Sequence, residues 1–200
     1  VFSHSSLDTI ISHAEDGNMI YLPGGNIILE NDLLIDKEVH IIGAGHYPDS
    51  SAATSVTFVS GDNIRFVKGS SGSSLTGIYL YNDLYFAKSD EDTVHFIDVS
   101  RCNLGHVALG HYFSRRNSGS SNLRFSENVI RGNVNGADVQ FCLFEKNIIS
   151  TQISYFNGNC TFRNNIFTHY ASYQNVFSHS SGLIVNNNIF TRDNHGLEGS

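Results

Sequence analysis

The C-terminal half of the chain repeats one short pattern of apolar and polar residues four times. Each copy has an apolar residue, two polar residues, an asparagine and two further apolar residues, and the copies occupy 125–130, 144–149, 162–167 and 185–190. Successive copies begin 19, 18 and 23 residues apart. A period of about twenty residues with strand-like apolar positions is typical of a solenoid, in which each repeat forms one coil.

Alternation with a period of two predicts which side chains point into the solenoid. The first apolar residue of each copy points inward, and so does the residue two places before it, which is Leu123, Cys142, Cys160 or Leu183. Looser copies at 97–104 and 75–80 extend the pattern, with Cys102 at the place of the asparagine. We therefore expect an inward column, with steps of about 4.8 Å, of Val99, Phe125, Phe144, Phe162 and Val185.

The repeated asparagines predict a sharp corner in each coil. Asparagine tolerates left-handed backbone angles and bonds to neighbouring backbone groups. We expect the asparagine itself to bend the chain, so that the apolar residue two places later points inward again. The prediction for Asn147 and Asn165 is that both are buried, with their amides bonded along the stack and to the backbone of the bend.

The N-terminal half begins with a predicted amphipathic helix. Its apolar residues from Leu7 to Ala14 have helical spacing behind a Ser6 cap, and a helix across the first coil is the expected cap of a solenoid. Strand-like runs follow at 19–22, 26–29, 33–35, 39–42, 56–59, 64–67, 84–87 and 94–97, with a loop at 46–55. We expect a single domain over 1–200, with a cap at 1–16, coils at 17–190 and a tail at 191–200.

The run from Gly17 to Gly25, the later run from Ile41 to Gly45 and the asparagine-rich repeats together resemble a known superfamily. They are similar to the right-handed parallel β-helix proteins of the pectin-lyase-like superfamily, including secreted bacterial members. The resemblance covers the chain from the capping helix to Phe190. It implies an all-β fold of three parallel sheets with asparagine ladders at one corner. It also implies several functions, because this fold hosts lyases, hydrolases, epimerases and non-catalytic adhesins.

Composition limits the function further. The formal net charge of −7 makes a general nucleic-acid-binding role improbable. No apolar run approaches the roughly 20 residues that span a bilayer. Residues 1–15 contain no basic stretch followed by an apolar core, so no signal peptide is expected in them, although one could have been removed. Together with the resemblance, this predicts a secreted or cell-surface location.

The three cysteines allow two interpretations. Cys142 and Cys160 share one inward column, while Cys102 lies at the corner. Buried free thiols that act as small apolar side chains are the first interpretation. A disulfide between Cys142 and Cys160 is the second, and it would imply an oxidising compartment.

Two outward columns precede the asparagine corner. One contains Ser100, Ser126, Glu145, Arg163 and Asn186, and the other contains Arg101, Glu127, Lys146, Asn164 and Asn187. Asp98 and Arg124 are expected to face each other one strand residue earlier. Cross-strand ion pairs, each worth about 0.2–1 kcal/mol, are one interpretation. An acid and base pair on a polysaccharide groove is the other.

The resemblance implies that lyases of this fold use clustered carboxylates to hold calcium, with an arginine or lysine as base, and that hydrolases use neighbouring aspartates. Calcium requires several oxygen ligands, and glycoside cleavage requires two carboxyl groups. The regular coils show no such cluster, so these motifs cannot be transferred. The one acidic run is Asp90, Glu91 and Asp92, which is either a solvated turn or a weak Ca²⁺ site.

Two irregular loops hold the candidate ligand-binding residues. The loop at 105–121 contains His106, His111, Tyr112, Arg115 and Arg116, which could bind an acidic sugar, with His111 as a proton-transfer group. The loop at 168–181 contains His169, Tyr170, Tyr173 and His179, which suit stacking against sugar rings. Ordinary surface decoration is the alternative for both loops. No zinc-ligand spacing accompanies these histidines.

Two functional hypotheses follow. The first is a non-catalytic extracytoplasmic β-helix that binds a glycan or acts as an adhesin-like surface module. The second is a polysaccharide lyase or glycoside hydrolase that acts on acidic polysaccharide. The polar tail after Phe190 has no capping pattern, so a homodimer through the open C-terminal end is one expectation. The alternatives are that the tail crosses the end with Leu197 in the core, or that further coils follow in a longer protein.

Overall fold

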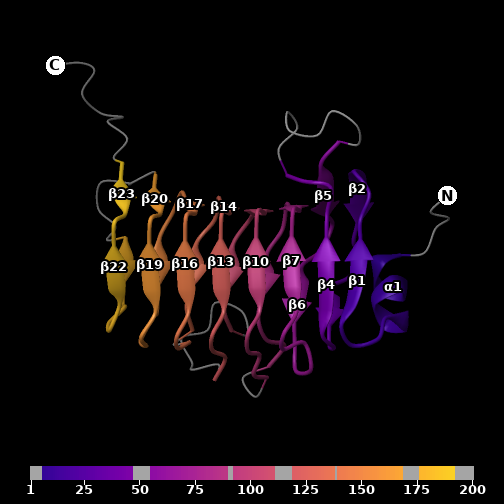
Figure 1. Ribbon diagram of the computed structural model, residues 1–200, viewed down its shortest axis with the longest axis horizontal. Coiled ribbons are helices and arrows are strands. Elements are labelled where there is room, and N and C mark those ends of the chain that lie inside the picture. The colour runs from indigo at the N-terminus through magenta and orange to yellow at the C-terminus, as the bar shows by residue number, and fades with distance from the viewer. Residues whose placement is uncertain are drawn as a thin grey trace.

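The chain winds into a parallel β-helix. The computed structural model describes residues 6–46, 55–89, 92–110, 119–137, 139–168 and 176–191. Each coil gives one strand to each of three parallel sheets, called A, B and C, and Figure 1 shows the strands of sheet A side by side from the N-terminal helix to the last coil. The predicted fold class, a solenoid of three parallel sheets with one short N-terminal helix, is confirmed.

Sheet A has eight strands in the order in which the chain makes them. They are β1 (Asn18–Tyr21), β4 (Val39–Ile42), β7 (Ser74–Thr76), β10 (Asp98–Ser100), β13 (Arg124–Ser126), β16 (Leu143–Glu145), β19 (Thr161–Arg163) and β22 (Ile184–Asn186). Neighbouring strands pair in parallel, with Val99 beside Phe125 and Phe125 beside Phe144.

Sheet B follows sheet A in every coil and also has eight strands. They are β2 (Gly25–Ile28), β5 (Thr57–Ser60), β8 (Tyr79–Leu80), β11 (Asn103–Leu104), β14 (Val129–Ile130), β17 (Ile148–Ile149), β20 (Ile166–Phe167) and β23 (Ile189–Phe190). Sheet C has seven, which are β3 (Leu33–Ile35), β6 (Ile64–Phe66), β9 (Leu84–Tyr85), β12 (Val107–Ala108), β15 (Val134–Asn135), β18 (Ile153–Ser154) and β21 (Phe177–Ser178).

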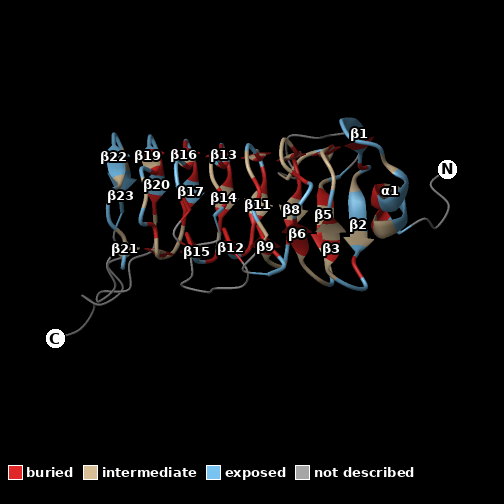
Figure 2. Ribbon diagram, turned by 90° about the horizontal axis from the view of Figure 1, so that it is seen from below, coloured by how far each residue is buried: buried red, intermediate tan, exposed pale blue. Residues whose placement is uncertain are grey.

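The core is built from stacked inward side chains, as the alternation predicted. The Phe125 and Phe144 rings stack with centroids 4.5 Å apart, and those of Phe144 and Phe162 are 4.7 Å apart. These separations match the strand spacing, because each ring sits on the equivalent ring of the next coil. All three side chains are fully buried. Figure 2 shows the buried residues lining the inside of the solenoid.

The predicted N-terminal cap is confirmed. Helix α1 spans Leu7–His13, and the Ser6 hydroxyl accepts a hydrogen bond from the Thr9 amide at 3.4 Å. Leu7 and Ile11 are buried in the same apolar cluster as the first coils. The helix therefore covers the inward side chains that the first coil would otherwise expose.

The asparagine ladder is also confirmed. Asn128, Asn147 and Asn165 are each 1% exposed. The Asn165 side-chain amide donates to the Phe144 carbonyl at 2.9 Å and to Asn188 Oδ1 at 3.0 Å. Asn128 and Asn147 repeat this arrangement in the two preceding coils. Each side-chain amide therefore donates to a backbone carbonyl and to the asparagine of the next coil.

The bend at this corner is made by a different residue from the one predicted. The left-handed residue is the one before each ladder asparagine, with φ of 60° at Glu127, 56° at Lys146 and 57° at Asn164. Within the ladder the backbone amide and the side-chain amide of one asparagine both donate to the next Oδ1, which requires ordinary backbone angles. The bend falls on the preceding residue because its side chain is exposed and makes no hydrogen bond inside the corner.

Not every predicted strand forms. The run 94–97 contains only an isolated bridge between His95 and Ser121, and Phe96 within it has a φ of 58° and is 68% exposed. The left-handed residue turns the chain from sheet C into sheet A, so β10 begins only at Asp98. The prediction of a strand at 94–97 is wrong because alternation of apolar residues continues through a corner.

The three cysteines are free and buried, in agreement with the first interpretation. The Cys102 amide donates to Asn128 Oδ1 at 2.9 Å, so Cys102 ends the ladder as predicted. Burial raises the pKa of the Cys102 thiol to about 12, which leaves it protonated and unreactive at neutral pH.

The last described coil is the most exposed. Val185 is 39% exposed and Phe190 is 50% exposed, whereas their counterparts Phe162 and Phe167 in the coil before are 0% and 1% exposed. Figure 2 shows this coil as the exposed end of the solenoid. Among the described residues, no helix is long and apolar enough to cross a bilayer.

Candidate functional site

Most of the predicted ligand-binding residues lie outside the described residues. His106 and His179 are described, and the His179 ring stacks on that of Tyr155 with centroids 5.1 Å apart. The others are not described: His111, Tyr112, Arg115, Arg116, His169, Tyr170 and Tyr173. The predictions for these seven side chains stay predictions.

His106 lies in the turn between β11 and β12 and contacts the next coil. Its Nδ1 accepts a hydrogen bond from the Asn133 amide at 2.8 Å. A side chain at Gly132 would come within 2.6 Å of the same nitrogen, so the imidazole packs directly on the turn above it. This contact gives His106 a part in aligning two coils.

The acidic run is described only at Asp92. Asp92 Oδ2 accepts hydrogen bonds from the Lys88 amide at 2.7 Å and the Ser89 amide at 3.1 Å, which is the geometry of a turn. Asp90 and Glu91 lie outside the described residues. Where the structure describes the chain, no group of three or more His, Cys, Asp or Glu side chains is placed to hold a metal ion. The weak Ca²⁺ site stays a prediction.

The outward face of sheet A carries the predicted ion pairs. Glu145 is at their centre, and its two carboxylate oxygens accept from Arg124 Nη2 and Arg163 Nη2, each at 2.7 Å. The hydrogen bond from Arg124 is the main reason why the pKa of Glu145 is lowered. Glu127 pairs in the same way with Arg101 at 3.0 Å and with Lys146 at 4.0 Å. The charges of this face therefore neutralise one another across strands.

Asp98 is the exception within that network. Its Oδ2 accepts from Arg124 Nη1 at 3.2 Å, while its Oδ1 is buried with no hydrogen-bond partner among the described residues. Burial raises the pKa of Asp98, against the lowering effect of the Arg124 charge. Asp98 and Glu145 share Arg124 as a partner, so both carboxyl groups belong to one ion-pair network.

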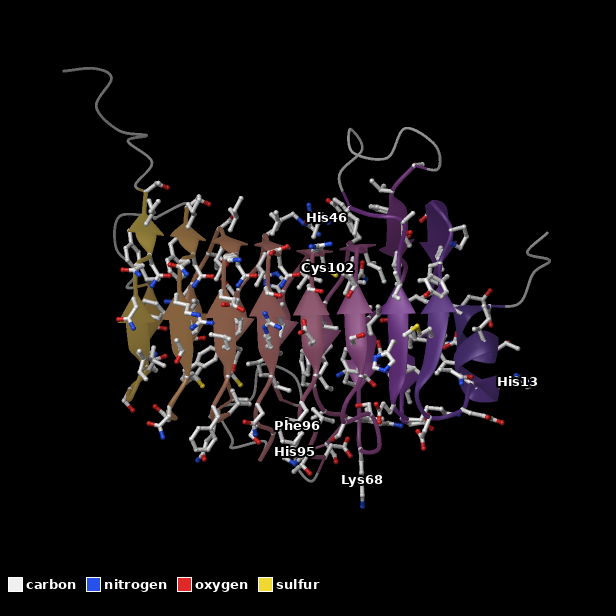
Figure 3. All side chains as sticks on the ribbon, in the orientation of Figure 1. His13, His46, Lys68, His95, Phe96 and Cys102 are labelled. Carbon is white, nitrogen blue, oxygen red and sulfur yellow. The ribbon has the colours of Figure 1, made fainter. Side chains whose placement is uncertain are left out.

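Figure 3 shows a second group of polar and aromatic side chains at the ends of the sheet A strands that lie away from sheet B. His95 and Phe96 lie there, whereas Cys102 and His46 lie at the corner towards sheet B. His95 Nδ1 is 3.0 Å from Ser121 Oγ, which repeats the 3.0 Å contact between His40 Nδ1 and Ser74 Oγ. Because the same contact recurs at separate coils, these pairs are cross-strand bonds of the solenoid.

The outward face of sheet B, here called the B face, differs from sheet A in carrying almost no charge. The strand pairings of sheet B place one residue of each strand in a single column: Asn26, Phe58, Tyr79, Asn103, Val129, Ile148, Ile166 and Ile189. None of the eight is ionisable at neutral pH. The column has aromatic rings towards its N-terminal end and aliphatic side chains towards its C-terminal end.

Three rings gather at the N-terminal end of the B face. The centroids of Phe58 and Tyr79 are 5.0 Å apart, and those of Phe58 and Tyr81 are 6.1 Å apart. Tyr81 follows β8 on the same face and is 60% exposed. The rings are tilted against one another, and Phe58 and Tyr79 are half-buried. An aromatic cluster of this kind offers a large apolar contact area with polar groups at its edge.

Arg131 fixes the middle of this cluster. Its Nε donates to Asn103 Oδ1 at 2.7 Å and its Nη2 donates to the Leu80 carbonyl at 2.9 Å. Its Cζ lies 4.8 Å from the centroid of the Tyr79 ring, within the range of a cation–π contact. Tyr79 is therefore held in place before any ligand binds, which lowers the entropy cost of binding.

A second candidate lies at the turns between sheets B and C in the first coils. Asn63 Nδ2 donates to Asp32 Oδ1 and to Asp62 Oδ1, each at 2.8 Å, and so joins two carboxyl groups from successive coils. Arg65, which is 4% exposed, donates from Nε to Asp32 Oδ2 and lies 4.1 Å above the Tyr85 ring. The pair borders an open hollow of about 620 Å³ that Lys88 also lines.

The two carboxyl groups have different acidities. Burial alone would raise the pKa of Asp32, but hydrogen bonds from Arg65 and Asn63 hold it at about 2. The carboxyl contact with Asp32 raises the pKa of Asp62. Two touching carboxyl groups of unequal acidity are the arrangement in which one stays ionised while the other can carry a proton.

Sequence reasoning missed this pair, although the chain contains a signal for it. Adjacent Asn and Asp residues precede three sheet C strands in a row, at 31–32, 62–63 and 82–83. The spacing between the first two is enlarged by the 46–55 segment, which hides the repeat. The ring cluster of the B face was also missed. Phe58 and Tyr79 belong to coils of unequal length, so the sequence does not show that they are neighbours.

Comparison of this chain with protein-family models, with curated proteins and with solved structures finds no match, so the parallel β-helix rests on the structure itself and the resemblance to the pectin-lyase-like superfamily stays a prediction.

Proposed function

We propose that the protein is a non-catalytic, extracytoplasmic glycan-binding module whose binding surface is the aromatic end of the B face. The observation that carries the proposal is the aromatic cluster of half-buried Phe58 and Tyr79 with exposed Tyr81, in which Arg131 holds Tyr79. Aromatic faces pack against the CH groups of pyranose rings, while the phenols and the Asn103 amide can bond to hydroxyls. A solenoid suits such a module, because it presents a long and rigid surface.

The experiment that tests this proposal uses two exposed tyrosines. Tyr81 on sheet B is 60% exposed and Tyr21 on sheet A is 65% exposed. In affinity electrophoresis against a panel of soluble polysaccharides, Tyr81→Ala is expected to weaken retardation by about tenfold, which is the loss of one stacked ring. Tyr21→Ala is expected to behave as the wild type. Equal effects of both changes, or no retardation of the wild type by any polysaccharide, would contradict the proposal.

A second candidate function is hydrolysis of a polysaccharide at the Asp32 and Asp62 pair. The joined carboxyl groups beside an open hollow favour it. Their direct contact weighs against it, because glycosidases keep their two carboxyl groups about 5 Å or more apart. We therefore place binding before catalysis.

The hydrolase hypothesis has its own test. Wild type is incubated with acidic and neutral polysaccharides, and the release of reducing ends or of unsaturated uronate is measured. Activity that Asp62→Asn abolishes, and that Asp36→Asn at an exposed turn leaves unchanged, would support hydrolysis or lyase chemistry at this pair. Wild type that cleaves nothing leaves the binding function as the remaining proposal.

The partner proposed besides the glycan is a second copy of the chain. The exposed inward residues of the last described coil, Val185 and Phe190, support a contact there. A sheet edge with apolar side chains beside it is a common site of pairing between chains.

A further inference from the structure

We infer that the ligand of the B face is an uncharged polysaccharide, and that it lies along the solenoid axis across the column from Phe58 to Ile166. The inference rests on the proposed glycan-binding function and names the ligand class of that same site. It differs from the acidic glycan that the sequence predicted for the loop at 105–121.

The first argument is the contrast between two faces of one molecule. Sheet A carries acidic and basic residues in its outward columns, including Asp98, Arg124 and Glu145. The register column of sheet B carries none over eight strands. This column therefore offers no charged side chain to an ionic ligand, whereas it offers apolar contact to an uncharged one.

The second argument concerns the cations that an acidic sugar would need. Carboxylate recognition favours an arginine fork with free N–H groups. Arg131, the charged side chain beside the rings, already uses its Nε and Nη2 edge to donate to Asn103 and to the Leu80 carbonyl. The arginines of the described residues elsewhere are bonded to carboxylates: Arg65, Arg101, Arg124 and Arg163. The net charge of −7 also repels a polyanion before contact.

The third argument is what the column offers instead of charge. The column is apolar apart from the Tyr79 phenol and one neutral amide, with Asn103 between Tyr79 and Val129. Beside the aliphatic part, the Thr168 hydroxyl donates to the Ser150 hydroxyl at 3.1 Å, which adds neutral polar groups at its edge. A neutral polysaccharide presents the same two features, CH faces and hydroxyl groups.

The orientation follows from the register. The column crosses the strands at right angles with a step of about 4.8 Å, so it is parallel to the solenoid axis. Ile148 and Ile166 are each 36% exposed and continue the surface beyond the rings. A chain that begins on the rings therefore meets further apolar surface only if it runs along the axis. Longer oligosaccharides are expected to bind more tightly than short ones.

The first test compares polymers that differ in charge alone. Affinity electrophoresis is run with methyl-esterified and de-esterified homogalacturonan, and with hydroxyethyl cellulose and carboxymethyl cellulose. The expected result is retardation by the neutral member of at least one pair, more strongly than by its charged counterpart, and unchanged by added salt. Retardation by charged members only, binding that salt weakens, or no binding to any neutral polymer would overturn the inference.

The second test places opposite charges at one exposed position of the column. Ile148→Lys and Ile148→Asp are expected to weaken binding of a neutral chain to the same extent, because both replace apolar contact by a solvated charge. An acidic ligand would separate them, since the lysine would strengthen binding and the aspartate would weaken it. Thr161→Asp on sheet A is the matched control, and circular dichroism confirms that each variant is folded.

The two proposals fail in distinguishable ways. If Tyr81→Ala abolishes binding to a charged polymer that the wild type retains, the glycan-binding function stands and the neutral ligand class is wrong. If Ile148→Lys and Ile148→Asp leave binding unchanged while Tyr81→Ala abolishes it, the site stands but the axial orientation is wrong. If wild type binds no polysaccharide, both proposals are wrong.

Discussion

Asn147 donates from its side-chain Nδ2 to Oδ1 of Asn165, at 3.0 Å, across two successive coils. The same Asn165 oxygen accepts the backbone amide of Asn147 at 3.0 Å. One side-chain carbonyl therefore satisfies two buried donors of the coil before it. Because asparagine supplies both this acceptor and a side-chain donor, the ladder position is asparagine at four successive coils.

The ladder is expected to make Asn165→Leu strongly destabilising. Leucine would leave the Asn147 donors and the Phe144 carbonyl without partners inside the solenoid, at a cost of about 3 kcal/mol or more. Chemical denaturation measures this difference. Asn164→Gly is the matched control, because Asn164 is exposed with a φ of 57°, and its replacement is expected to leave stability equal or higher. Equal losses in both variants would contradict a special role for the ladder.

Phe96 is expected to be a site at which stability can be raised. Its left-handed backbone costs a non-glycine residue about 1 kcal/mol, and its ring is 68% exposed. Phe96→Gly is therefore expected to raise the free energy of unfolding by up to about 1 kcal/mol. Tyr81→Gly, at an exposed aromatic residue without a positive φ, is expected to lower it. A loss at Phe96 would show that its ring makes a contact that matters.

Asp98 predicts one direction of pH dependence. Burial raises its pKa in the folded protein above the ordinary value of 3.8, so its contribution to stability is present below that value and is lost as the pH rises through the raised pKa. Asp98→Asn keeps the uncharged form at all pH values. Its stability relative to wild type is expected to increase between pH 3 and pH 7, measured by thermal unfolding. A constant difference would show that Asp98 titrates normally.

Asp32 predicts the opposite direction. Its pKa of about 2 lies below the ordinary value of 3.8, so its contribution is present above 3.8 and is lost as the pH falls towards 2. Asp32→Asn is expected to be less stable than wild type at pH 7, and the deficit is expected to shrink on acidification. A deficit that grows at low pH would assign the loss to something other than the bond to Arg65.

The exposed side chains of the last described coil predict association between copies. Light scattering over a concentration series is expected to show a dimer at high concentration, because Val185 and Phe190 are exposed beside a sheet edge. Val185→Asp is expected to abolish the dimer. Ile28→Asp, at an exposed position of β2, is expected to leave it intact. A monomer at every concentration would leave the end to be covered within the chain.

The repeats in the sequence are enough to predict the solenoid, its inward columns and its asparagine corner. Apolar residues at 125, 144 and 162 and asparagines at 128, 147 and 165 recur at nearly constant spacing, and each coil repeats the environment of the one before it. Local alternation therefore also fixes the contacts between coils. The pairs Asp98–Arg124 and Glu145–Arg163 followed from the same register. The diagonal contact between Arg124 and Glu145 did not.

Which surfaces can act as sites depends on how the coils stack in three dimensions. Asp32 and Asp62 are thirty residues apart and meet because two coils of unequal length stack. The ring cluster of Phe58, Tyr79 and Tyr81 forms across coils in the same way. Alternation says that a side chain points outward but not which neighbour it meets once the period changes, because register between coils is set by packing of the whole turn. The left-handed bend before each ladder asparagine is also a feature that alternation does not predict. It accompanies the hydrogen bonds that the asparagine amides form when the coils stack.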